Sequence, residues 1–385
     1  MEFETVGIFG IVIGVIARFW PVWLALGIIL ALSLRYKKML GLYGHLFDTG
    51  VGIAGLMICL FWLFTAIFAD VIAPFDPLQQ VAILKNAVPG TVDPGSGLPF
   101  LFGGDRLARD VFSRMVFGSQ IVLVIAPAAT MFALMVGTTL GLPAGYYGGR
   151  IDNFLSFLAN LVLAFPVILL FYLLVTPGIR ETAIPQWLAG IFFIFPVIFF
   201  GTLFYTRFKS RPGLLAAQLA ITALIGGWVY IGLVFNKDPL GIISIRPNEL
   251  NIFVAVVFAS SPGVFRIVRG LTMDIKTRDY VAAAQTRGEN PWYIMLWEVL
   301  PNARGPLIVD ACLRIGYTTI LLGTLGYFGL GLAPESPDWG TGIKESSRLL
   351  RAYIHPALPP VFALMSFVLG LNLLADALRE QSLKD

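Results

Sequence analysis

Few side chains in this sequence combine the residue type and the spacing that enzyme chemistry requires. Asp310 and Arg314 lie four residues apart at the start of an apolar segment. In a helix such a pair shares one face and can neutralise itself. The two histidines, His45 and His355, stand near the ends of other apolar segments. We therefore interpret the Asp310–Arg314 pair as structural, and the histidines as interfacial.

The sequence contains no motif for nucleotide binding and none for metal binding or disulfide formation. The chain lacks the Gly-x-x-x-x-Gly-Lys-Ser/Thr loop that cradles phosphates. Cys59 and Cys312 both lie in apolar segments, where a free cysteine behaves as a small buried hydrophobe. No metal-ligand spacing or disulfide framework is present in the sequence.

The most informative polar stretch is "DYVAAAQTRGENPWYIMLWEVLPNARGP", residues 279–306. Its first part, 279–290, predicts an amphipathic helix with three small, helix-favouring alanines, Ala282, Ala283 and Ala284. A small-residue face allows another protein surface to approach the backbone closely. Gly288 permits a sharp turn, Asn290-Pro291 can begin a second helix, and Leu300-Pro301 ends it. An ordinary interfacial loop remains the alternative.

The composition indicates that membrane-spanning helices flank this stretch. The chain has 385 residues, of which 57% are hydrophobic and 13% charged, whereas soluble domains carry roughly 25% charged residues. Apolar runs of membrane-spanning length recur and are continuous rather than alternating, which excludes a β-barrel. We therefore predict an all-α, polytopic helical membrane protein of about nine spans. The predicted spans are 6–34, 49–68, 117–142, 154–175, 187–206, 214–235, 250–269, 306–331 and 356–376.

The distribution of basic residues gives an orientation. The formal net charge is +4, and the Lys and Arg residues cluster in particular loops. This pattern fits the positive-inside rule better than nucleic-acid binding. Arg35, Lys37 and Lys38 mark the first cytoplasmic loop. Counting crossings from there places the "RFKSRPG" turn, the 270–300 stretch and the C-terminus in the cytoplasm, and the loops 69–110 and 332–352 outside.

The stretch 279–301 resembles the cytoplasmic EAA signature of ABC-importer permeases. Ala283, Ala284, Gly288, Leu300 and Pro301 stand in register with that signature, whereas its Glu is replaced by Ala282. In the family this helix docks on the ATPase subunit, so the resemblance implies an ATPase-coupling role for these residues and for Tyr280. The substitution by Ala282 puts in doubt any contact that the carboxylate makes.

Other stretches extend the resemblance to the C-type permease of dipeptide, oligopeptide and nickel importers. They appear in the family's order and cover about 49–176 and 250–380. They are "FGGDRLARDVFSRMVFGSQIVL" (102–123), "GTTLGLPAGYYGGRIDNFLSFLANLVLAFPVILL" (137–170), "TLGYFGLGL" (324–332), "SPDWG" (336–340) and "LNLLADALRE" (371–380).

The resemblance divides the chain into four parts. Residues 1–48 form an extra N-terminal membrane segment with a cytoplasmic linker, and 49–176 form the first part of a six-span permease core. Residues 177–249 form an inserted two-span hairpin, and 250–385 complete the core with the coupling loop 279–301. Because the insert adds an even number of crossings, it leaves that loop in the cytoplasm.

The family implies a transmembrane permease subunit of an ATP-driven importer for peptides or related small solutes. Its implied partners are a second homologous permease, two ABC ATPase subunits, an extracytoplasmic binding protein and the lipid bilayer, without nucleic acid. This chain itself would bind no cofactor and no metal, because ATP and Mg²⁺ belong to the ATPases. The implied location is the bacterial inner membrane. The alternatives are an integral-membrane enzyme, which needs clustered polar groups within the membrane, and a purely structural membrane subunit.

Overall fold

The computed structural model describes residues 4–180, 182–238, 240–241, 247–330, 332 and 335–382. The chain forms two compact units, residues 1–127 with 315–385 and residues 128–314. The unit boundaries fall inside two long helices, α6 (Val111–Tyr147) and α17 (Arg304–Phe328). Parts of the stretch 236–249, between two predicted spans, and of the predicted loop 332–352 lie outside the described residues.

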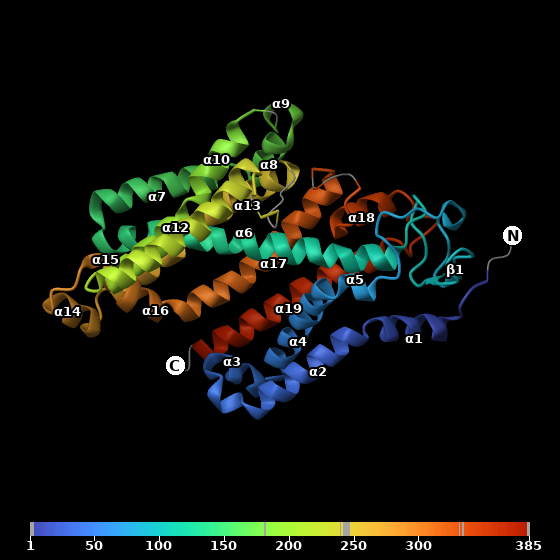
Figure 1. Cartoon of the computed structure of the whole chain (residues 1–385), viewed down its shortest axis with the longest axis horizontal. Helices are drawn as coiled ribbons and strands as arrows, with labels where there is room; N and C mark the ends of the chain where they lie inside the picture. Colours follow the sequence, from blue (N-terminus) through green and yellow to red (C-terminus); the bar gives the residue numbers. More distant parts are fainter. Residues whose placement is uncertain are drawn as a thin grey trace. The chain divides into compact units, whose positions relative to one another are not determined.

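The first unit is built around α4 (Gly50–Ile67) and α19 (Leu358–Ser382), which pack side by side (Figure 1). Trp62, Phe112, Trp339 and Phe367 form the centre of its apolar core. The unit also contains α1 (Ile8–Arg18), α2 (Trp20–Arg35), η1 (Lys37–Met39), α3 (Gly41–His45), η2 (Leu46–Asp48), α5 (Ala69–Ile72), η3 (Ala82–Leu84) and α18 (Trp339–Ser347).

The predicted loop 69–110 is more ordered than its proline content suggested. It contains an antiparallel pair, β1 (Thr91–Val92) and β2 (Pro99–Phe100), in which Thr91 lies opposite Phe100. Phe75, Leu84 and Phe100 are buried together in a small cluster of their own. The sequence signal was weak because the apolar residues of this cluster are far apart along the chain.

The second unit contains the predicted insert 177–249 and the predicted coupling loop 279–301. Its helices are the second part of α6, α7 (Gly149–Ala164), α8 (Val167–Val175), α9 (Pro177–Arg180), α10 (Ile184–Phe193), α11 (Phe195–Phe208), α12 (Pro212–Phe235), α13 (Pro247–Ile275), α14 (Asp279–Thr286), α15 (Pro291–Tyr293), the π-helix η4 (Ile294–Val299), α16 (Leu300–Asn302) and the first part of α17.

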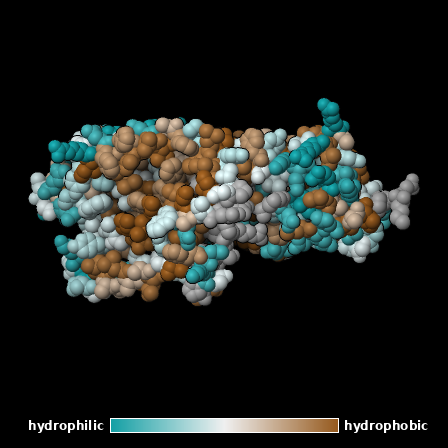
Figure 2. Space-filling model, turned by 90° about the horizontal axis from the view of Figure 1, so that it is seen from above, coloured by the Kyte–Doolittle hydropathy of each residue, from teal (hydrophilic) through white to brown (hydrophobic). Residues whose placement is uncertain are grey.

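The described helices confirm an all-α membrane protein. Seven are long and apolar enough to cross a bilayer, and the count reaches nine if two bent pairs each form one span. Many large apolar side chains remain exposed (Figure 2), as expected where lipid rather than water covers a helix.

The two bent pairs show how proline shaped the predicted spans. The predicted span 6–34 bends by 54° between Arg18 and Trp20, and Pro21 occupies the first turn of α2, where its missing N–H is tolerated. The predicted span 154–175 bends by 77° at Phe165-Pro166, so it is two helices rather than one. Pro166 keeps Phe165 extended, which ends α7.

Candidate functional site

The predicted coupling helix is the eight-residue α14, Asp279–Thr286. Asp279 stands in its first turn, where a negative charge complements the helix dipole. Val281 and Ala284 are fully buried, in an apolar cluster that also contains Val268 and Ile275 of α13 and Val299 of η4. This helix is therefore held by one narrow apolar stripe.

The three alanines of this helix do not share one face. Ala284 lies in the core, whereas Ala282 and Ala283 are exposed and Tyr280 is 39% exposed. Neighbouring helical residues are about 100° apart, so three in a row spread over about 200° of the helix and do not form one face. The expectation of a face made by all three alanines is thus corrected to an exposed pair, Ala282 and Ala283.

Gly288 ends the coupling helix in the way that the sequence predicts. Its φ is +77°, a conformation that favours glycine. Gly288 N–H donates to Gln285 O at 2.9 Å, and Glu289 N–H donates to Ala284 O at 3.3 Å. These two bonds make a Schellman C-cap. A Cβ added to Gly288 would meet open space, so glycine is needed here for backbone conformation rather than for packing.

The second half of the loop begins at Asn290. Its side-chain Oδ1 accepts a hydrogen bond from Trp292 N–H at 2.9 Å, and Pro291 takes the first helical position. The helical path runs on through η4 and α16 and ends at Asn302, not at Leu300-Pro301. Leu300 packs against the apolar cluster, whereas Pro301 and Gly288 are exposed.

The C-terminal end of α6 meets the 270–300 stretch, which the sequence predicts to be cytoplasmic. Gln285 Nε2 donates to the hydroxyl of Tyr146, in the last turn of α6, at 3.2 Å. Lys276 Nζ donates to the carbonyls of Gly145 and Tyr146 at 2.8 and 3.2 Å. A cation at the C-terminus of α6 also complements that helix dipole. The "GYYGGR" motif therefore supports α14 directly.

The helix leading into α14 is fastened closely to its neighbours. At Gly145 an added Cβ would lie 2.6 Å from the carbonyl oxygen of Arg269, so only glycine allows α6 and α13 to approach this closely. Arg269 also forms a bidentate ion pair with Asp152 of α7. The helix α13, which leads into α14, is thus joined closely to both α6 and α7.

The four polar residues considered for enzyme chemistry each lie against another group of the chain. Arg314 Nε donates to Asp310 Oδ2 at 2.5 Å, and Arg314 Nη1 donates to Ser260 O at 3.1 Å. His45 Nδ1 lies 3.1 Å from Asp48 Oδ2, and His355 Nε2 lies 3.4 Å from Gly104 O. Asp310 and Arg314 do form the predicted pair on one helix face.

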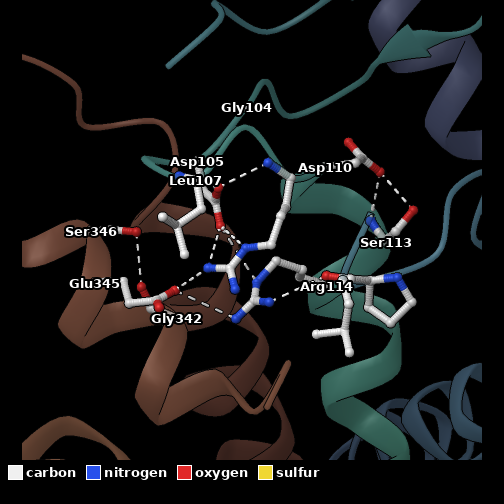
Figure 3. A network of polar contacts seen from close by, with 12 residues as sticks. Gly104, Asp105, Leu107, Asp110, Ser113, Arg114, Gly342, Glu345 and Ser346 are labelled. Atoms are coloured by element: carbon white, nitrogen blue, oxygen red, sulfur yellow. Dashed lines mark hydrogen bonds and ion pairs between the residues drawn. The ribbon is translucent and has the colours of Figure 1, made fainter. Parts of the chain in front are cut away.

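A second polar site, which the sequence analysis missed, lies in the first unit. Arg109 donates from Nε to Asp105 Oδ2 at 2.7 Å, and its Nη2 pairs with Glu345 of α18. Arg114 Nη2 lies 3.6 Å from the same Glu345 carboxylate and donates to Ser336 O at 3.0 Å. Figure 3 shows Asp105 and Arg114, near the start of α6, pointing toward Glu345 of α18. Two cations thus meet two anions.

We call Asp105, Arg109, Arg114 and Glu345 the ion network. Two further buried carboxylates, Asp110 and Asp338, belong to the same two segments. Asp110 Oδ2 accepts from the N–H and the hydroxyl of Ser113, at 2.8 and 2.7 Å. Its Oδ1 is buried without a partner among the described residues, and burial raises the pKa of Asp110 to about 6. Asp338 caps α18 by accepting from Thr341 N–H at 2.9 Å, and burial raises its pKa as well.

The "SPDWG" motif locks the same region. Trp339 is 1% exposed, and its Nε1 donates to Met115 O at 2.9 Å. Its ring meets Trp62 edge-on, with centroids 5.0 Å apart. The sequence signal for the ion network was the density of charges in "GGDRLARD" immediately before an apolar span, but its partner Glu345 is 236 residues from Arg109.

These features define a polytopic helical membrane protein with one compact loop projecting between two spans. A family described as the binding-protein-dependent transport system inner membrane component matches residues 137–382. The chain belongs to this family, and it is a permease subunit of an ABC importer.

Relatives of known name share most of its length. The di/tripeptide transport system permease protein DppC of Pseudomonas aeruginosa (strain UCBPP-PA14) is 28% identical over 350 residues, which cover 90% of this chain and 93% of that protein. DppC of Alkalihalophilus pseudofirmus is 27% identical over 330 residues, 86% of this chain and 84% of that protein. The glutathione transport permease GsiD of Pectobacterium atrosepticum is 26% identical over 330 residues, 86% and 85% respectively.

Proposed function

We propose that this permease subunit imports peptides and that α14 couples ATPase closure to the movement of its spans. The observation that carries the coupling role is the construction of the loop. Ala282 and Ala283 offer a small exposed surface, while Val281 and Ala284 fix the opposite side of α14 to α13 and η4. A push on the exposed pair would therefore be transmitted to the spans rather than absorbed.

The docking surface depends on shape more than on charge. Ala282 stands where the family signature has Glu, so that carboxylate supplies no contact here. Small side chains allow close approach of a groove on the ATPase, and the Schellman turn at Gly288 fixes where the helix ends. Tyr280, partly exposed beside this surface, adds an aromatic edge for the same contact.

The proposed complex contains a second homologous permease, two ABC ATPases that bind ATP and Mg²⁺, and an extracytoplasmic binding protein. ATP closes the ATPases, which push α14 and favour one of two arrangements of the spans. Such a shift requires that the partners bind the two arrangements with different affinity. Delivery of substrate by the binding protein would take place at the loops 69–110 and 332–352.

The chain is proposed to lie in the inner membrane with its C-terminus in the cytoplasm. Two observations support this orientation. In the first unit, the helix α19 contacts α3 and η2, beside the basic residues Lys37 and Lys38. In the second unit, the loops with exposed Arg278 and Arg287 meet the last turn of α6.

Peptides are the substrate class that the relatives favour. Their names specify di- and tripeptides, dipeptides and glutathione, and glutathione is itself a tripeptide. Nickel chelates, which belong to the wider family, have no counterpart among these names. Competition between a radiolabelled dipeptide and glutathione for uptake would establish the preferred ligand.

The coupling role is tested with Gly288→Val in the complete complex reconstituted in proteoliposomes. Valine strongly disfavours a φ of +77°, so the C-cap should rearrange. We expect stimulation of ATP hydrolysis by the binding protein and dipeptide uptake both to fall, while the complex still assembles.

Gly270→Val is the matched control for this experiment. Gly270 lies inside α13, its Cβ position is open, and it lacks the positive φ of Gly288. Normal stimulation and uptake in Gly288→Val, equal to those of Gly270→Val, would show that this loop does not couple the two processes.

A further inference from the structure

The inserted hairpin touches the coupling loop through the last turn of α11. Trp297 Nε1, in η4, donates a hydrogen bond to Thr206 Oγ1 at 3.1 Å. The guanidinium carbon of Arg207 lies 4.8 Å from the centroid of the Trp297 ring, within cation–π distance. Leu203 and Phe199, one and two turns earlier in α11, pack against the apolar cluster that buries Val281 and Ala284.

The same segment is held from its other side. Glu298, the next residue along η4, accepts a hydrogen bond from Arg287 Nη2 at 3.1 Å. Arg287 is the residue that immediately follows α14. Two adjacent residues of η4 therefore link α11 of the insert to the C-terminal end of the coupling helix. A π-helix is rare and adaptable, and such turns are frequent at functional sites.

The insert is anchored to the core behind this contact. Phe193 of α10 meets Phe253 of α13 edge-on, with centroids 5.3 Å apart, and both rings also meet Phe132 of α6. Because α13 leads directly into α14, the chain closes a loop of contacts. It runs from α13 through α10 and α11 to η4, and from η4 through Arg287 back to α14.

We propose that the inserted hairpin braces the coupling loop, and that Thr206 and Arg207 are positioning residues acting through Trp297. The brace limits how far η4 can yield when α14 is pushed. More of the displacement then reaches α13 and α6. This inference rests on the coupling role proposed above. It gives the insert 177–249 a function, which the sequence alone does not indicate.

The test is the double variant Thr206→Val/Arg207→Met in the reconstituted complex. The readouts are dipeptide transported per ATP hydrolysed, the KM for ATP, and the yield of complex recovered through a tag on this chain. We expect yield and KM to match wild type while the transport ratio falls by roughly 2- to 30-fold, the range found for mutations along a coupled network. A merely structural role would change the yield instead.

The control is Thr202→Val/Lys209→Met. Thr202 lies one turn earlier in α11 and makes the same bonds to its own helix as Thr206, but the described contacts show none to Trp297. Lys209 carries the same charge as Arg207, two residues further on, without the ring contact. This control should keep the wild-type ratio, and Arg207→Lys should restore most of the loss of Arg207→Met.

Three outcomes would overturn the brace: an unchanged ratio in the double variant, an equal fall in the control, or a fall in yield alone. An unchanged ratio alongside a coupling defect in Gly288→Val would reject the brace and leave the coupling role standing. Normal coupling in both variants would reject the coupling role itself. If the double variant does not accumulate, Trp297→Phe, which keeps an aromatic ring but loses the N–H donor, replaces it, and an unchanged ratio there would reject the brace.

Discussion

The ion network of the first unit and the coupling loop of the second are built in opposite ways. Arg109 and Arg114 are 1% and 5% exposed, and their partners include Glu345 and Ser336, which are more than 200 residues away in the sequence. The charged contacts of the coupling loop, Arg287–Glu298 and Arg278–Asp274, are exposed and local. One region is fixed by buried charges, and the other is held by a narrow apolar stripe.

The contrast separates two requirements of a transporter. Buried ion pairs are costly to break because the remaining charge loses its partner, so the network should hold α18 rigidly against the start of α6. Exposed pairs contribute little, so the charged contacts of the coupling loop add little to its stability. We therefore expect substitutions in the network to lower stability and substitutions in the loop to lower coupling.

The largest effect on stability is expected from Arg109→Met. It leaves the carboxylates of Asp105 and Glu345 with less compensation, and removing one partner of a buried pair costs about 3–5 kcal/mol. Thermal unfolding of the purified chain in detergent measures this loss of stability. Arg106→Met, at an exposed neighbour without a described ion pair, is the control; equal midpoints for the two variants would contradict a rigid network.

Asp110→Asn should have a smaller effect of opposite sign. The folded-state pKa of Asp110 is raised from 3.8 to about 6, so the folded protein holds this proton more tightly than the unfolded one. Stability from this group is therefore full below pH 4 and is lost as the pH rises through 6.

The Asn side chain can still accept from Ser113 but carries no charge. We expect Asp110→Asn to be more stable at pH 7 by on the order of 2 kcal/mol, and to lose the pH dependence between 4 and 6. Unfolding curves at pH 4.5 and 7 decide it, with the exposed Asp76→Asn as control. A variant less stable than wild type at pH 7 would contradict the burial argument.

Gly288→Ala should lower the local stability of α14 by about 1 kcal/mol, because a positive φ is unfavourable for alanine. Since α14 has only two buried side chains, the cost should appear locally. Hydrogen exchange of the amides in Val281–Thr286 should accelerate about fivefold, with the unfolding midpoint nearly unchanged. Gly270→Ala is the control, and faster exchange across the whole second unit would contradict a locally held helix.

The smallest effect is expected from Glu298→Gln. Its pair with Arg287 is exposed, so the loss should be below about 1 kcal/mol and should vanish in high salt. A salt-independent loss as large as that of Arg109→Met would remove the difference between the two regions.

The helical class, most of the spans and the position of α14 could be predicted because these depend on local signals. Continuous apolar runs mark the spans, and Gly288 with Asn290-Pro291 marks the turn between α14 and α15. The bend at Phe165-Pro166 was underestimated because apolar periodicity continues through it.

Tertiary partners could not be read in the same way. The division of the three alanines follows from helix geometry, but which of them turns inward depends on η4 and α13. The contact of Thr206 and Arg207 with Trp297 joins residues about ninety positions apart, and nothing in either local pattern indicates the other. The same holds for Glu345 in the ion network.

The most direct test of the coupling role compares neighbouring positions in α14. Cys59 and Cys312 are first replaced by Ser, and single cysteines are then introduced as Ala283→Cys, which is exposed, and Ala284→Cys, which is fully buried. A short thiol-specific cross-linker is applied to the assembled complex. We expect an adduct between position 283 and the ATPase subunit, and little adduct from position 284. No ATPase adduct from 283, in a complex that still contains the ATPase, would contradict it.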